Sequence, residues 1–146
     1  MSKLLNTMES FWEWTGLGNT WGDSELDISK VDPLYCPEFE ELRNVCISSI
    51  NLPLSPKEIN AFLLCMAFDS EEEYILDACR EFARPDFLEI LLQTGITFPH
   101  SEARWQMAEL LKRDIPLKEN YLRTLLDDSD PYVRKRANNT LMWHPR

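Results

Sequence analysis

An acidic run is the segment of this chain best equipped for chemistry. Asp69-Ser70-Glu71-Glu72-Glu73 follows the longest apolar stretch, Ala61 to Phe68, and Asp77 comes soon after. We expect the run to begin a helix, where carboxylates are favoured by the helix dipole. That structural interpretation stands beside a functional one, in which Glu71, Glu72, Glu73 and Asp77 contact a basic partner.

Residues suited to catalysis or metal binding are sparse. The two histidines, His100 and His144, have no Ser or Cys nucleophile motif beside them. The cluster Asp127, Asp128 and Asp130 lacks the glycine and the distal glutamate of a calcium loop. No zinc-protease, phosphate-loop or EF-hand motif occurs. We therefore predict no catalytic residue, no metal, no cofactor and no enzymatic activity.

Trp105 is the aromatic residue we select as a partner contact. It lies roughly 200° from the apolar stripe of its expected helix, at about 100° per residue. Exposed tryptophans are frequent anchors of protein interfaces. The alternative is that Trp105 is buried, because a stacked helical array covers both faces of its inner helices.

The net charge narrows the classes of partner. The 146 residues contain 15 Lys and Arg against 25 Asp and Glu, a net charge of −10. Residues 1–100 carry −12 of this charge, and residues 101–146 carry +2. An acidic surface repels phosphate backbones and anionic membranes. We therefore expect a basic protein partner, no nucleic acid and no membrane.

The cysteine pattern and the hydropathy point to the cytoplasm. The four cysteines form no closely spaced pair, and three of them lie among apolar residues, as reduced buried thiols do. The longest apolar run has eight residues, far short of the ~20 that span a bilayer. The N-terminus also lacks the apolar core of a secretory signal.

Proline placement and apolar spacing predict an all-α chain in one domain. Most of the nine prolines separate segments of helical periodicity, and no segment alternates as a strand does. We expect helical hairpins over 55–84, 86–113 and 117–143, preceded by an N-terminal helical cap over 1–54. The second helix of each expected hairpin shows the same residue spacing, beginning at Ile75, Arg104 and Arg134. These starting positions are 29 and 30 residues apart. That period is typical of an α-solenoid.

The final hairpin resembles a HEAT repeat. Leu122 to Arg134, followed by Ala137 and Leu141, is similar to the pattern of leucines, an acidic turn, Asp-Pro and Val-Arg-x-x-Ala-x-x-x-Leu. Over residues 55–143 the resemblance implies a short HEAT-like right-handed α-solenoid. It also implies a structural role for Asp130, paired with Arg104 and Arg134 between repeats.

The expected function is stoichiometric binding of a protein. Basic nuclease toxins act on a polyanion, so an acidic inhibitor can speed association and block their site. The sequence therefore predicts an immunity protein that neutralises a basic toxin domain, with a bacterial toxin-immunity protein as the type. Two alternatives remain open: a HEAT-like scaffold that binds a peptide or protein, and a nucleic-acid enzyme of the HEAT-like glycosylase type.

Overall fold

A computed structural model describes residues 2–18 and 20–143 of the chain. Within these residues all regular structure is helical, so the predicted all-α class is confirmed. His144, one of the two histidines considered for catalysis, lies outside the described residues. The helices are α1 Lys3–Thr15, η1 Ile28–Lys30, α2 Pro37–Ser48, α3 Pro56–Phe68, α4 Tyr74–Phe82, α5 Pro85–Gly95, α6 Ser101–Leu110, α7 Lys118–Leu126 and α8 Pro131–Leu141.

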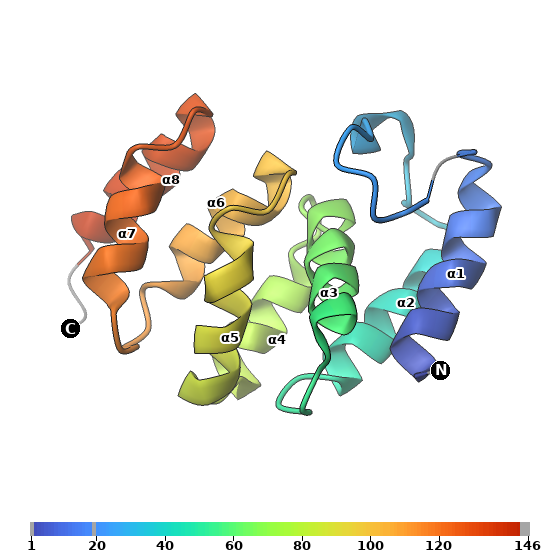
Figure 1. Cartoon of the computed structure of the whole chain (residues 1–146), viewed down its shortest axis with the longest axis horizontal. Helices are drawn as coiled ribbons and strands as arrows, with labels where there is room; N and C mark the ends of the chain where they lie inside the picture. Colours follow the sequence, from blue (N-terminus) through green and yellow to red (C-terminus); the bar gives the residue numbers. More distant parts are fainter. Residues whose placement is uncertain (1, 19, 144–146) are drawn as a thin grey trace.

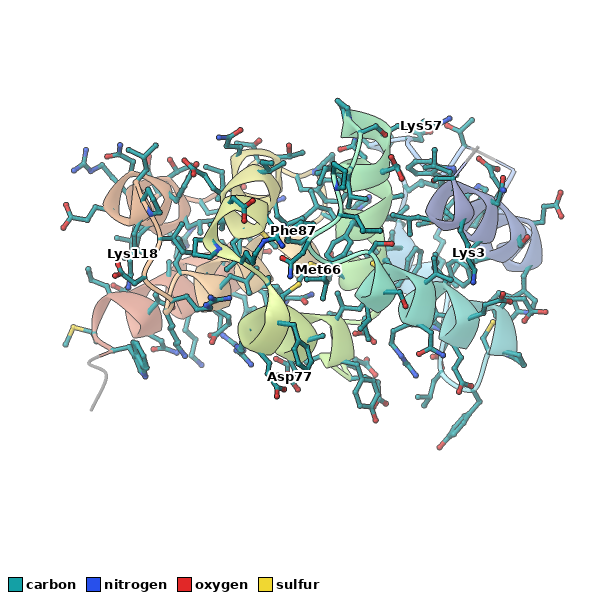
Figure 2. All side chains as sticks on the ribbon, turned by 90° about the horizontal axis from the view of Figure 1, so that it is seen from below. Lys3, Lys57, Met66, Asp77, Phe87 and Lys118 are labelled. Carbon is teal, nitrogen blue, oxygen red and sulfur yellow. The ribbon has the colours of Figure 1, made fainter. Side chains whose placement is uncertain are left out.

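The helices form two layers. Helices α1, α3, α5 and α7 lie in one layer, and α2, α4, α6 and α8 lie in the other (Figures 1 and 2). Contacts join α1 to α3 and α3 to α5 in the first layer, and α2 to α4, α4 to α6 and α6 to α8 in the second. The region expected as a cap supplies its own helix pair, because α1 packs against α2. This layering accords with a solenoid, while membership of the HEAT-like family stays a prediction.

Helix α3 is the centre of the core. Nine of its 13 residues are buried, and it contacts α1, α2, α5 and α6. A helix that is apolar all round has no solvent face. Its start is fixed by Ser55 and Glu58, which exchange hydrogen bonds with each other's backbone N–H as a capping box.

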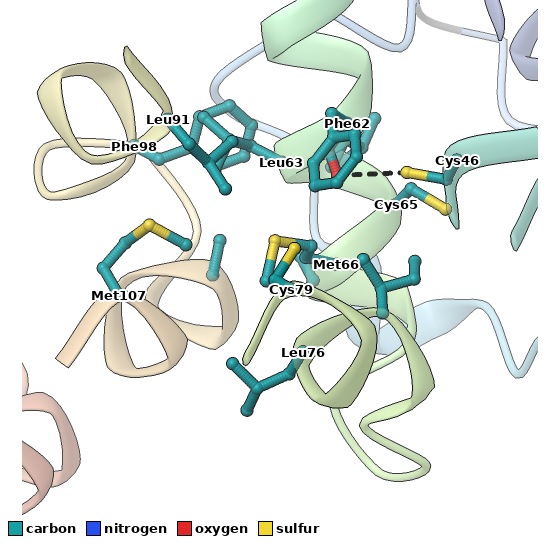
Figure 3. Close-up of a cluster of buried hydrophobic side chains, with 14 of the residues drawn as sticks. Cys46, Phe62, Leu63, Cys65, Met66, Leu76, Cys79, Leu91, Phe98 and Met107 are labelled. Atoms are coloured by element: carbon teal, nitrogen blue, oxygen red, sulfur yellow. Dashed lines mark hydrogen bonds between the residues drawn. The ribbon is translucent and has the colours of Figure 1, made fainter. Parts of the chain in front are cut away.

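Three buried thiols belong to this core. Cys46, Cys65 and Cys79 lie around α3 with Phe62 and Met66 (Figure 3). The Cys46 thiol is 4.0 Å from the Phe62 carbonyl oxygen. Burial raises the pKa of Cys79 to about 12 and also raises that of Cys46, so both remain neutral thiols.

Candidate functional site

A pocket with many carboxylates opens between the α1–α2 connection and the α3–α4 turn. It has a volume of about 690 Å³. We call it the acidic pocket, and its lining residues are Ile28, Ser29, Val31, Asp32, Pro33, Leu34, Tyr35, Cys36, Phe39, Glu40, Arg43, Ala67, Phe68, Asp69, Ser70, Glu71, Glu72, Tyr74 and Glu102. Helices α2, α3, α4 and α6 therefore all contribute to it.

The acidic pocket concentrates negative charge. Its described lining includes six carboxylates, namely Asp32, Glu40, Asp69, Glu71, Glu72 and Glu102, against a single cation, Arg43. The carboxylates come from four separate segments of the chain, so only the fold brings them together. Grouped charges of one sign attract oppositely charged partners and raise the rate of association.

Asp69 is the buried carboxylate of the pocket. Its side chain has no exposed surface, and its Oδ2 accepts a hydrogen bond of 2.8 Å from the Ile75 N–H. Its Oδ1 accepts no hydrogen bond, and Nη1 of Arg43 is 3.6 Å from it. Burial raises the pKa of Asp69 to about 6, against the opposing effects of the Ile75 hydrogen bond and the Arg43 charge.

Arg43 lies between two aromatic rings. Its guanidinium carbon is 4.6 Å from the centroid of the Tyr74 ring and 5.8 Å from that of Phe39. A guanidinium over an aromatic face gains cation–π attraction. The ring contacts and Asp69 hold Arg43 half-buried at the wall of the pocket.

Exposed aromatic side chains adjoin the carboxylates. Tyr35 is 94% exposed and adopts a left-handed backbone conformation with φ of 63°, while Tyr74 is 50% exposed. The Tyr35 ring is almost fully solvated, so it adds little to the stability of the fold. Aromatic side chains beside charged groups are favoured at protein interfaces.

The structure separates the four predicted acidic contacts. Glu71 and Glu72 are exposed and line the acidic pocket. Glu73 and Asp77 are outside its lining; Glu73 adopts a left-handed φ of 59° just before α4. Asp77 forms a 3.0 Å ion pair with Arg80, and Figure 2 shows it at the outer face of α4.

The prediction that the acidic run begins a helix was wrong. The acidic run forms a turn, and α4 begins at Tyr74. The carboxylate of Asp69 accepts the Ile75 N–H from the far side of that turn. Because Asp69 caps the helix from across the turn, Glu71 and Glu72 lie in the turn and not in a helix.

The choice of Trp105 as a partner contact was also wrong. Trp105 is 7% exposed. The Arg136 guanidinium covers its ring at 4.3 Å, and the Tyr132 ring packs against it edge-on at 5.7 Å. Helix α8 therefore covers the face of α6 opposite its apolar stripe. Trp105 lies on that face and stabilises the packing of the two helices.

The predicted pairing of Asp130 with two arginines needs correction as well. Arg104 instead binds Asp128 in a bidentate pair, with Nε and Nη2 at 2.9 and 3.2 Å from its oxygens. Arg134 donates to the Asp128 carbonyl oxygen at 2.6 Å. Asp130 caps α8 by accepting from the Tyr132 and Val133 N–H groups. An N-cap carboxylate is committed to backbone donors, which leaves Asp128 to pair with Arg104.

The ion pairs of Glu109 were not predicted from the sequence. Its buried carboxylate pairs with Arg80 of α4 at 2.9 Å, with Lys112 just after α6 at 2.8 Å and with Arg136 of α8 at 2.6 Å. Burial alone would raise the pKa of Glu109, but the hydrogen bonds and charges of Lys112 and Arg136 lower it. Arg80 and Glu109 are 29 residues apart, which matches the repeat offset, so searching for opposite charges at that period would have found the pair.

Two further pockets are lined by connections within the helix pairs. One, of about 850 Å³, has mixed charge, with Arg104, Arg123, Asp127 and Asp128 in its lining. The other, of about 810 Å³, is lined by an extended set that includes Glu9, Glu13, Trp12, Trp21, Phe98 and His100. Burial lowers the pKa of His100, so its imidazole is neutral at pH 7. These connections lie along the upper edge of the molecule in Figure 1.

The basic stretch of α8 is largely occupied within the fold. Arg136 is bound to Glu109 and to the Tyr132 hydroxyl, and Arg134 to a backbone carbonyl, which leaves Lys135 as an exposed cation.

Among the described residues no cluster of His, Cys, Asp and Glu has the arrangement of a metal site. None of the helices in this part of the chain is long and apolar enough to cross a membrane.

Comparison of the chain with protein-family models, with curated proteins and with solved structures gives no significant match. The inferences that follow are therefore drawn from the residues of the pockets and their geometry.

Proposed function

We propose that this chain is a stoichiometric protein-binding inhibitor that uses the acidic pocket to bind a basic partner. The observation that carries the proposal is the convergence of six carboxylates with the exposed Tyr35 and Tyr74 rings. Aromatic anchors supply the apolar contact area of an interface, and complementary charge steers the partner and fixes its orientation.

The proposed partner is a toxin domain of the nuclease type. Such a domain carries a basic surface because its substrate is a polyanion, so a carboxylate-rich pocket can occupy the site that the phosphates would fill. The proposal makes the chain an immunity protein in the cytoplasm. The four free, buried cysteines support that location, since reducing compartments keep thiols unpaired.

Affinity capture with matched variants tests the proposal. Wild-type chain, the pocket variant E71Q/E72Q and the control D114N/E119Q are immobilised and exposed to lysate of the native cell at low salt. Both variants lose two negative charges at exposed positions, but only the first changes the acidic pocket. We expect one basic protein to bind the wild type and the control, to elute with salt, and to be depleted from the pocket variant.

Three outcomes would contradict the proposal. Equal capture of the basic protein by all three chains would show that the acidic pocket is not part of the interface. Capture that resists high salt would favour the scaffold that binds a peptide. Binding of DNA at a physiological ionic strength of about 0.15 M would favour a nucleic-acid enzyme.

A further inference from the structure

A second pocket combines aromatic walls with an imidazole that has no hydrogen-bond partner. We call it the aromatic pocket; its volume is about 810 Å³, and Trp12, Trp21, Phe98 and His100 are in its lining. These side chains come from α1, from the connection after it and from the α5–α6 connection, so only the fold brings them together. Concave, mostly apolar pockets of about 300–1,000 Å³ with a few polar groups are the usual sites of small ligands.

His100 is the polar group that the aromatic pocket leaves unsatisfied. The residue is only 8% exposed, and its imidazole forms no hydrogen bond with any described residue. Its ring nitrogens are nevertheless open to solvent, in contrast to the sealed oxygen Oδ1 of Asp69, so a ligand in the pocket can reach them. A neutral imidazole has one nitrogen that donates and one that accepts. Buried polar groups normally have partners, so the open imidazole indicates a ligand.

The aromatic walls are held in place before any ligand binds. Nε1 of Trp21 donates a hydrogen bond of 2.7 Å to Oε1 of Glu9, and Trp21 is 7% exposed. Trp12 is buried on the neighbouring side chain of α1, and the Phe98 ring lies 5.7 Å from that of His100. A pocket whose side chains are already fixed loses little conformational entropy when it binds a ligand.

The charges around the aromatic pocket favour a cation. Its described lining includes three carboxylates, Glu9, Glu13 and Asp23, against a single cation, Lys57. Nζ of Lys57 is 5.8 Å from the centroid of the Trp21 ring, so this wall already attracts an ammonium group. An anionic ligand would instead meet a net negative lining.

We propose that the aromatic pocket binds a small arylalkylamine that carries a phenolic hydroxyl. The ring of the ligand packs against Trp12, Trp21 and Phe98, its hydroxyl donates to the acceptor nitrogen of His100, and its ammonium faces the carboxylates. Aromatic rings gain from stacked or edge-on contacts beyond the area they bury. This inference goes beyond the proposed function and is independent of it, because the aromatic and acidic pockets share no described lining residue.

Titration of the full chain with three matched ligands at neutral pH tests the inference. The ligands are tyramine, phenethylamine, which lacks the hydroxyl, and desaminotyrosine, which has a carboxylate in place of the ammonium. Binding is followed by the indole N–H and imidazole signals of the isotope-labelled chain. We expect tyramine to shift the signals of Trp12, Trp21 and His100. It should bind about fivefold more tightly than phenethylamine and at least about tenfold more tightly than desaminotyrosine.

The variant H100F provides the second arm of the test, because it keeps a ring at this position and removes both nitrogens. H100F should bind tyramine and phenethylamine equally. The control T97V loses a hydroxyl in the same connection, but Thr97 is exposed and outside the lining, so its preference for tyramine should match that of the wild type.

Four results would overturn the inference. They are equal affinities of tyramine and phenethylamine for the wild type, binding of desaminotyrosine as tight as that of tyramine, an unchanged tyramine preference in H100F, and tighter binding of the peptide amide Tyr-Gly-Gly than of tyramine. The last would assign the pocket to the N-terminus of a protein, which carries the same ring, hydroxyl and ammonium. We expect the peptide to bind more weakly, because its additional peptide groups lose water on binding. The ligand comparisons on the wild type decide the matter even if H100F fails to fold.

Discussion

Asp69 has the most costly environment of any described carboxylate in the acidic pocket. Its ionised form is buried with an unfilled acceptor, and one arginine at 3.6 Å compensates only in part. The stability of the free chain should therefore record the cost.

We expect D69N to change how stability depends on pH. The folded-state pKa of Asp69 is about 6, above its usual 3.8. The carboxyl therefore supports folding below about pH 4, and this contribution is lost as the pH rises to about 6. Relative to D69N, the wild type should lose about 3 kcal/mol of unfolding free energy between about pH 4 and pH 7. Urea unfolding of both proteins across this range measures the difference, and a constant difference would refute the assigned environment.

Glu109 has the opposite character, because its burial is compensated by three cations. E109Q should lower the unfolding free energy by about 3 kcal/mol, since it leaves Arg136 and Arg80 without their shared partner. D77N is the control: Asp77 pairs with Arg80 at the surface and is 63% exposed, so its loss should cost less than about 1 kcal/mol. Equal effects of the two substitutions in urea unfolding would contradict the network.

Single residues show where sequence reasoning succeeds and where it stops. Glu71 and Glu72 could be selected from the acidic run, because exposed charge is visible in a sequence. The pairing of Arg43 with Asp69 could not be predicted, since it depends on the packing of α2 against the end of α3. Trp105 was misjudged because the periodicity of one helix does not reveal that α8 covers its second face.

At the scale of the helices, a glycine allows close packing of α5 on α6. A Cβ added at Gly95 would meet Met107 Sδ at 2.4 Å and Leu63 Cδ2 at 3.2 Å. Both neighbours are fully buried, so they have little freedom to move.

We expect G95A to destabilise the protein by about 1–3 kcal/mol through this overpacking. The matched control is G22A, because an added Cβ there meets no atom within 4 Å. Thermal unfolding should show a lowered midpoint for G95A alone. A midpoint of G95A at or above the wild-type value would contradict the packing described for α3, α5 and α6.

Local signals predicted most helix boundaries. Ser55-Pro56 and Asp130-Pro131 mark the starts of α3 and α8, since a capping side chain and a proline at the first position act within a few residues. The start of α4 was missed because its cap comes from Asp69, across a turn. The connection before α2 carries no such periodic pattern, although its residues from Ile28 to Cys36 form one wall of the acidic pocket.

At the scale of the whole molecule, the fold determines where the excess charge acts. The net charge of −12 in residues 1–100 is spread along the sequence. The two layers bring a part of it together, because α2, the α3–α4 turn and the connection before α2 meet at one pocket. The more basic C-terminal segment has much of its positive charge bound to Glu109 and Asp128.

The salt dependence of partner affinity tests the central claim most directly. The dissociation constant of the captured basic protein is measured at rising NaCl concentration for the wild type, E71Q/E72Q and D114N/E119Q. We expect wild type and control to lose affinity steeply with salt, and the pocket variant to bind more weakly at low salt with a shallower dependence. Equal affinities and equal salt dependence for all three chains would contradict an acidic pocket that binds a basic partner.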